Sequence, residues 1–175
     1  MPDPNLSAAI QEAYASAPSD TVIYHTLEIY HPAFTVPIRV VRDKSDLTAT
    51  LESTAPRDAG TAVTFIGFAF DVVPPDMTAT AIPQCKIEID NVTSEILAQI
   101  DAAMGSSELV TVIYRAYLSN DLTVPSNNPP LTMNVLAITA TMFRITATCG
   151  FDNLANKRFP SMTYTSEIFP GLILQ

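Results

Sequence analysis

The sequence predicts a mainly β fold with a minor helical part: an antiparallel β-sandwich or partly closed barrel, with an N-terminal helix and one crossing helix. Three observations support this prediction. About eight segments alternate apolar and polar residues with the period of a strand. Two segments have the spacing of a helix. Strands and helices do not alternate along the chain as they do in βαβ units.

The helix at the start is predicted over residues 5–17, NLSAAIQEAYASA. Asn5 or Ser7 can accept hydrogen bonds from the first free amides of this helix. Ile10 and Tyr14 lie four residues apart, on one face, and a proline follows. We therefore divide the chain into an N-terminal helical arm and a single β domain, residues 1–19 and residues 20–175.

The first half of the β domain contains four strand-like stretches. Residues 21–30 alternate clearly, and residues 36–41 follow after the turn-like HPAFTVP, which predicts a hairpin. Residues 47–51 form a weaker strand. Residues 61–76 are apolar at alternate positions, and Gly67 among them indicates a bulge or bend.

The second half begins with the clearest strand, residues 82–91, in which apolar and polar side chains alternate without a break. The pattern then changes to helical spacing over residues 92–105, the crossing helix. Residues 108–119 form a strong strand and residues 123–130 a turn. Residues 131–150 form two strands or one long bent strand.

The composition is that of a folded domain with few charges. The chain has 175 residues, of which 47% are hydrophobic and 15% charged, against about 25% charged in typical proteins. A surface with so few charges is often partly covered by partners. The net charge of −9 disfavours binding to nucleic acid, because phosphates would be repelled. We expect no signal peptide and no membrane insertion.

The residues that usually carry chemistry are few and dispersed. Cys85 and Cys149 both lie in apolar alternating runs, which favours buried thiols over a disulfide. They form no C-x-x-C pair, and His25 and His31 form no metal-binding spacing. No nucleophile motif accompanies either histidine. We therefore expect no catalytic residue, no metal and no cofactor, and a protein that is not an enzyme.

The most distinctive stretch is the nearly uncharged end of the chain, RFPSMTYTSEIFPGLILQ, residues 158–175. Its apolar side chains need a covering surface, which is either the protein's own β domain or a neighbouring molecule. A second candidate contact is the turn that ends the strand at residues 61–76. The predicted interface residues are Phe169, Pro170, Gly171, Leu172, Ile173, Leu174, Pro74, Pro75 and Asp76.

Four stretches in this order carry a family resemblance: LEIYHPAFTVPIRVV, FIGFAFDVVPPD, IPQCKIEIDNVTSEILAQI and FPSMTYTSEIFPGLI. Over residues 20–173 the chain resembles a family of tailed-bacteriophage proteins of formally unknown function, encoded among tail-tip genes. It is also similar to the N-terminal domain of phage lambda's minor tail protein L. The most specific parts are IEIDNV (residues 87–92) and the terminal Phe-Pro-Gly (residues 169–171).

The resemblance implies a structural protein of the virion. Proteins of this kind sit at the distal end of a long, non-contractile tail (a siphovirus tail), between the tail tube or distal tail ring and the central fibre hub. They form a homo-oligomeric ring around the channel, with a trimer favoured over a hexamer. They are made in the bacterial cytoplasm. Relatives of the lambda kind carry a further cysteine-rich domain, which we expect to be missing here.

Two other functions are compatible with a β domain of this composition. One is a module that binds glycans or the host surface, which would require clustered exposed aromatic residues. The other is a tail-assembly chaperone that leaves before the virion is complete. A cell-wall hydrolase has the least support from the sequence.

Overall fold

The computed structural model describes residues 6–16, 18, 20–73, 84–90, 108–141 and 144–151. These residues contain one helix and nine strands. In chain order the elements are α1 (Ala8–Ser16), β1 (Ile23–Tyr30), β2 (Ile38–Val41), β3 (Leu47–Thr50), β4 (Ala62–Gly67), β5 (Phe70–Val73), β6 (Gln84–Asp90), β7 (Thr111–Leu118), β8 (Leu131–Ala140) and β9 (Arg144–Gly150). The prediction of a mainly β fold with an N-terminal helix is confirmed.

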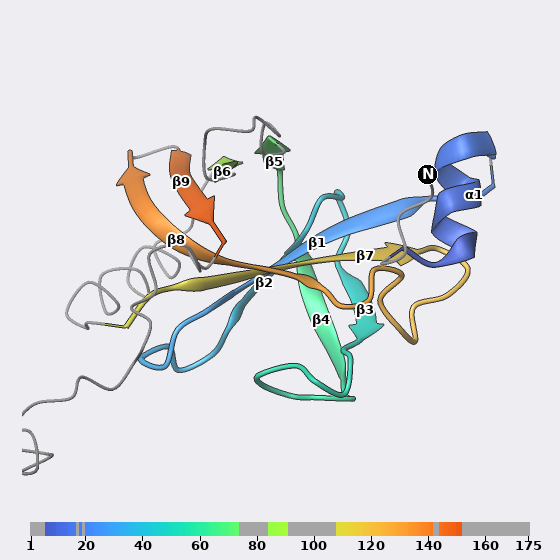
Figure 1. Cartoon of the computed structure of the whole chain (residues 1–175), viewed down its shortest axis with the longest axis horizontal. Coiled ribbons are helices and arrows are strands. Elements are labelled where there is room, and N and C mark those ends of the chain that lie inside the picture. The colour runs from blue at the N-terminus through green and yellow to red at the C-terminus, as the bar shows by residue number, and fades with distance from the viewer. Residues whose placement is uncertain are drawn as a thin grey trace, which may run out of the picture.

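The nine strands form one mixed sheet in the order β3-β4-β2-β1-β7-β8-β9-β6-β5 (Figure 1). Neighbouring strands are antiparallel, except that β4 lies parallel to β2. This exception arises because the hairpin of β3 and β4 attaches to β2 through its second strand, which runs in the direction of β2. The order ends at β3 on one side and β5 on the other, so the sheet is not closed into a barrel.

The N-terminal helix begins where Ser7 caps it. The amide of Ile10 donates a hydrogen bond to the Ser7 hydroxyl at 3.4 Å, as expected for an N-cap. The other predicted cap, Asn5, lies outside the described residues. Ile10 is fully buried and packs with Ala116 and Leu118 of β7. The arm is therefore held against the end of the β1–β7 pair, where Figure 1 shows α1.

Gly67 divides what the sequence suggested was a single bent strand. β4 ends at Gly67, and β5 begins at Phe70, at the opposite side of the sheet. A Cβ atom on Gly67 would lie 3.0 Å from backbone atoms of Asp43, Lys44 and Ser45 in the β2–β3 loop. Glycine therefore allows the two backbones to approach closely at the point where the chain leaves one edge for the other.

The other predicted strands are also present. The region 131–150 is two strands, β8 and β9, whose register shifts between Val135 and Ala137. The shift leaves Leu136 as an extra residue in β8, and such a bulge increases the local bend. β8 is strongly curved in Figure 1. The predicted crossing helix, residues 92–105, lies outside the described residues.

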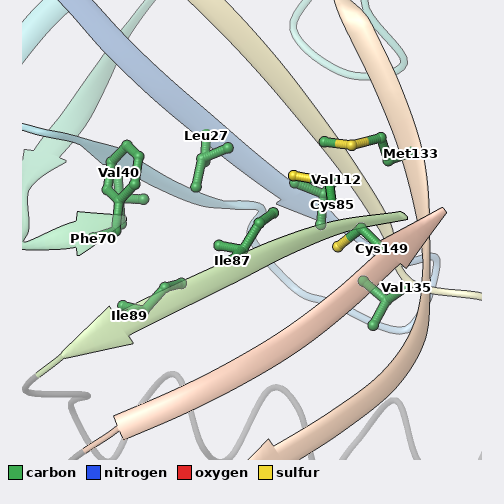
Figure 2. Packing of buried hydrophobic residues seen from close by; sticks show 10 residues of the cluster. All are labelled: Leu27, Val40, Phe70, Cys85, Ile87, Ile89, Val112, Met133, Val135 and Cys149. Carbon is green, nitrogen blue, oxygen red and sulfur yellow. The ribbon is translucent and has the colours of Figure 1, made fainter. Parts of the chain in front are cut away.

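The curvature brings strands from the two ends of the sheet together around one hydrophobic core. Figure 2 shows Leu27 of β1 and Val40 of β2 facing Ile87 and Ile89 of β6. The remaining buried members are Phe70, Cys85, Val112, Met133, Val135 and Cys149. Because distant strands share this core, one open sheet buries its inner face as the two layers of a sandwich do.

The opposite face of the central strands carries a second core. The hairpin of β3 and β4 supplies Leu47, Ala49 and Phe65, which pack with Tyr117 of β7 and Val41 of β2. The Tyr117 hydroxyl donates a hydrogen bond to the Thr50 carbonyl oxygen at 2.9 Å, which connects β7 to β3. The centre of the sheet is thus covered on both faces.

Between the central strands and this hairpin lies a buried ion network. Arg115 of β7 and Glu28 of β1 are both fully buried and pair at 2.6 Å. Arg115 also makes two hydrogen bonds to the Glu52 carboxylate, at 2.7 and 2.8 Å. Arg39 of β2 bonds the other oxygen of Glu28 at 3.0 Å and Asp58 at 2.7 Å. No polar side-chain atom buried in the described residues is left without a hydrogen-bond partner.

The pKa of Glu52 reflects its place in this network. Burial alone would raise the pKa of this carboxyl group. The hydrogen bonds from Arg115 and from the Glu52 backbone, together with the charge of Arg115, outweigh burial and lower the pKa below 4.5. Glu52 therefore stays ionised and keeps its bidentate contact with Arg115 at neutral pH.

We expect Gly67→Ala to lower the free energy of unfolding by about 1–3 kcal/mol, because the added methyl group meets backbone atoms that cannot move aside. Urea denaturation measures this. Gly150→Ala is the matched control, since its methyl group would meet only the end of the half-exposed Leu136 side chain. Equal effects of the two substitutions would contradict the close-approach explanation.

We expect Arg115→Met to lower the free energy of unfolding by about 3–5 kcal/mol, because it removes one of the two cations that bind the fully buried Glu28 and the bidentate partner of Glu52. Combining it with Glu28→Leu should recover part of the loss. Arg144→Met, which removes an exposed arginine paired with Glu88 and Asp90, should cost much less. A double variant as unstable as Arg115→Met alone would show that the weakened pairing of Glu28 is not the cause.

Candidate functional site

The interface residues predicted from the sequence lie outside the part of the chain that the structure describes. They are Phe169, Pro170, Gly171, Leu172, Ile173, Leu174, Pro74, Pro75 and Asp76. The structure does show the strand that precedes the second group, since β5 is described as far as Val73. The candidate site is therefore built from the described surface to which these segments are joined.

A cavity of about 330 Å³ opens beside β5, between the helical arm and the start of β8. We call it the His25 cavity. It is lined by Tyr14, His25, Arg42, Phe70, Val72, Cys85, Tyr114, Leu131 and Met133. These residues come from α1 and five strands, together with Arg42 directly after β2, so the cavity exists only when the sheet has curved and the arm has docked.

Two polar groups of the cavity wall are hydrogen-bonded to each other. His25 Nδ1 lies 2.7 Å from the Tyr114 hydroxyl, and the two rings are stacked. Burial, followed by the positive charge of Arg42, lowers the pKa of His25 below 6.5. Burial first, and then the neighbouring Tyr14 hydroxyl, raise the pKa of Tyr114. At neutral pH a neutral imidazole and a neutral phenol therefore share this hydrogen bond.

The two thiols at the cavity are unreactive at neutral pH. Cys85 and Cys149 lie directly opposite each other in β6 and β9, and both are free and buried, as the sequence predicted. Burial raises the pKa of Cys85. Burial and the proximity of Cys85 raise that of Cys149 to about 12. Since the thiolate is the reactive form, neither cysteine is suited to act as a nucleophile at neutral pH.

A more open groove of about 850 Å³ continues from the cavity around the start of β5, and Arg42 and Phe70 line both. Its other walls carry charges that pair with one another. Arg42 lies 3.5 Å from Asp71, and Arg144 bonds Asp90 at 2.6 Å. Such exposed pairs are weak and exchange readily with water or with a partner's charges.

The second histidine is part of the fold. His31 is fully buried, and its Nδ1 accepts a hydrogen bond from the Ala33 amide at 3.0 Å. Its Nε2 lies 3.3 Å from the Glu108 carbonyl oxygen. Within the described residues, no group of three or more His, Cys, Asp or Glu side chains is arranged to hold a metal ion.

Several large apolar side chains are exposed on the described surface. Two of them, Tyr14 (55% exposed) and Leu131 (40%), stand on the wall of the His25 cavity. The others are Val22, Val36, Ile66, Leu109, Val124, Leu136 and Ile138. The cavity is thus an apolar recess with exposed apolar side chains at its border, which is a feature of contact sites.

The sequence did not reveal this cavity. His25 gave a partial signal, because it occupies an inward-facing position between Ile23 and Leu27 in an otherwise apolar row. The same holds for Arg115, a charged residue within a strongly apolar strand. Their partners Tyr114 and Glu28 are 89 and 87 positions away along the chain, and no local pattern identifies them.

One family model matches the chain. It is described as a domain of unknown function (DUF1833), and it matches residues 9–164. No curated protein matches the chain. No helix among the described residues is long and apolar enough to cross a membrane.

We expect the stability of the protein to depend on His25 as the pH falls through about 6.5. The folded state holds the pKa of His25 below its ordinary value of 6.5, so near and below that pH the unfolded chain binds more protons. The free energy of unfolding should therefore fall as the pH drops through 6.5. His25→Gln should reduce this dependence in urea titrations. An imidazole that titrates at or above pH 6.5 in NMR spectra of the folded protein would contradict the expectation.

Proposed function

We propose that this chain, which belongs to the DUF1833 family of domains of unknown function, is a non-enzymatic structural subunit of the distal tail tip of a long-tailed bacteriophage. In this proposal it forms a homo-oligomeric ring, with a trimer favoured, between the tail tube or distal tail ring and the central fibre hub. The proposal rests on the resemblance of residues 20–173 to tail-tip proteins and on the character of the described surface.

The observation that carries the proposal is the open sheet with unlike edges. Among the described residues, β3 pairs only with β4 at one edge, and β5 pairs only with β6 at the other. The β3 edge is partly occupied, since the Thr50 amide donates to the Leu122 carbonyl oxygen at 2.9 Å. Copies that meet through two different surfaces associate head to tail, and such contacts close into rings when the rotation allows it.

The composition of the surface agrees with an assembly subunit. Only 15% of residues are charged, and nine large apolar side chains are exposed in the described part. The net charge of −9 suits a subunit that lines a DNA channel, provided that the acidic residues face the channel, because like charge prevents the DNA from adhering.

The described surface gives less support to the alternatives. A glycan-binding module stacks sugars on clustered aromatic rings. Of the exposed large apolar side chains in the described residues, Tyr14 alone is aromatic. For an enzyme, the imidazoles of His25 and His31 are engaged in the fold. A tail-assembly chaperone differs from a ring subunit only in whether it stays in the particle.

The proposal predicts that the protein is present, at a few copies per particle, in purified virions of the phage that encodes it. Quantitative mass spectrometry of those virions measures this. A chaperone would be present in infected cells and missing from the virions. Absence from the virions, or clear lytic activity of the pure protein on cell walls, would overturn the proposal.

A further inference from the structure

We propose that the His25 cavity is a receptor for the uncharged apolar segment 168–174 of a second copy of this chain. The inference rests on the proposed function, because a ring subunit needs two different surfaces that fit each other. It goes further by naming both surfaces and the chemistry that joins them.

The cavity is suited to an apolar group rather than an ion. His25 Nδ1 and the Tyr114 hydroxyl are engaged with each other at 2.7 Å. The walls around them are largely aromatic and aliphatic and include Phe70, Val72 and Met133. A volume of about 330 Å³ is at the lower end of the range of ligand pockets, enough for a few large side chains.

Large apolar side chains are exposed at the border of the cavity, so covering them would stabilise a complex through apolar burial. Tyr14 and Leu131 are 55% and 40% exposed, although both are large and apolar. Arg42 stands at the opening, loosely paired with Asp71 at 3.5 Å. An apolar occupant would bury the two exposed apolar side chains.

The chain carries one segment of matching chemistry. After Glu167 the sequence continues IFPGLIL without a charge. Phe169 offers an aromatic ring to a cavity with Tyr14, Phe70 and Tyr114 in its walls. Pro170 restricts the backbone and lacks an amide hydrogen, which lowers the cost of ordering and drying the segment.

The connection is long enough to reach a neighbour. β9 ends at Gly150, which lies opposite Gln84, the residue before Cys85 of the cavity wall. A return to the chain's own cavity would need only a few residues. The stretch 152–167 can span up to about 55 Å when extended, whereas a domain of this size has a radius of gyration of about 16 Å. That length suits a crossing to the next subunit.

Two variants of the full-length chain test the proposal by complementation. Leu131→Trp fills the cavity from its exposed border and leaves the tail intact, whereas Phe169→Ser with Leu172→Ser alters the tail and leaves the cavity intact. Each variant alone should self-associate at least tenfold more weakly than the wild type in sedimentation equilibrium. An equimolar mixture should form a one-to-one complex, since one intact cavity then meets one intact tail.

Matched controls separate docking from unspecific damage. Leu109→Trp places the same ring at a leucine that is 56% exposed and does not line the cavity. Phe159→Ser alters the other Phe-Pro pair, outside the segment. Both should self-associate as the wild type does, and all variants should keep its thermal unfolding midpoint within a few degrees.

Three results would overturn the proposal. These are a wild-type chain that stays monomeric at every concentration, a Leu131→Trp variant that self-associates normally, and a mixture that remains monomeric although each single variant is impaired. The first result is the one expected of a tail that fills the cavity of its own chain. All these measurements use the purified protein. They therefore test the docking of the tail independently of whether the protein is found in virions.

Discussion

The fold depends on the pairing of Glu28 with Arg115 at the centre of the sheet. Both side chains are fully buried, so each would destabilise the fold strongly without the other. Arg115 also donates two hydrogen bonds to Glu52, which follows β3 in the chain. The second oxygen of Glu28 accepts a hydrogen bond from Arg39 of β2. One ion network therefore sets how β1, β2 and β7 lie relative to the β3–β4 hairpin.

The other face of the same strands is held by apolar packing instead of ion pairs. There the curved sheet brings β5, β6 and β9 over β1 and β2 around an apolar core that includes Cys85 and Cys149. His25 and Tyr114 lie where this core meets the helical arm, and His25 Nδ1 and the Tyr114 hydroxyl form a hydrogen bond between uncharged groups. The recess is therefore lined by His25 and Tyr114 in uncharged form and by Cys85 as an unreactive thiol. Such a recess favours the packing of apolar groups and gives little support to catalysis.

Local sequence patterns were sufficient to predict the strands. They were not sufficient to predict contacts between residues that lie far apart in the sequence. Alternation at Cys85, Ile87 and Ile89 predicted β6 because a strand exposes alternate side chains to opposite faces. Gly67 indicated a bend, but not that the chain would cross from one edge of the sheet to the other. Arg115 was an unusual residue in its strand, yet its acid partners are 63 and 87 positions away. The cavity could not be predicted, because it is assembled from six elements and the residue after β2, brought together only by the curvature.

The two cores also limit where partners can bind. In the described residues the inner face of the sheet is filled by its own strands, and the outer face of its centre is covered by the β3–β4 hairpin. Neither broad face of that centre is free to stack on another molecule. What the described fold offers to partners is therefore its edges, the paired charges around β5 and the recess beside His25. An assembly built from such a subunit has to join through strand edges or through a segment inserted into a recess, and both kinds of contact are directional. Directional contacts between unlike surfaces are what a closed ring requires, since each subunit must offer one surface and accept another.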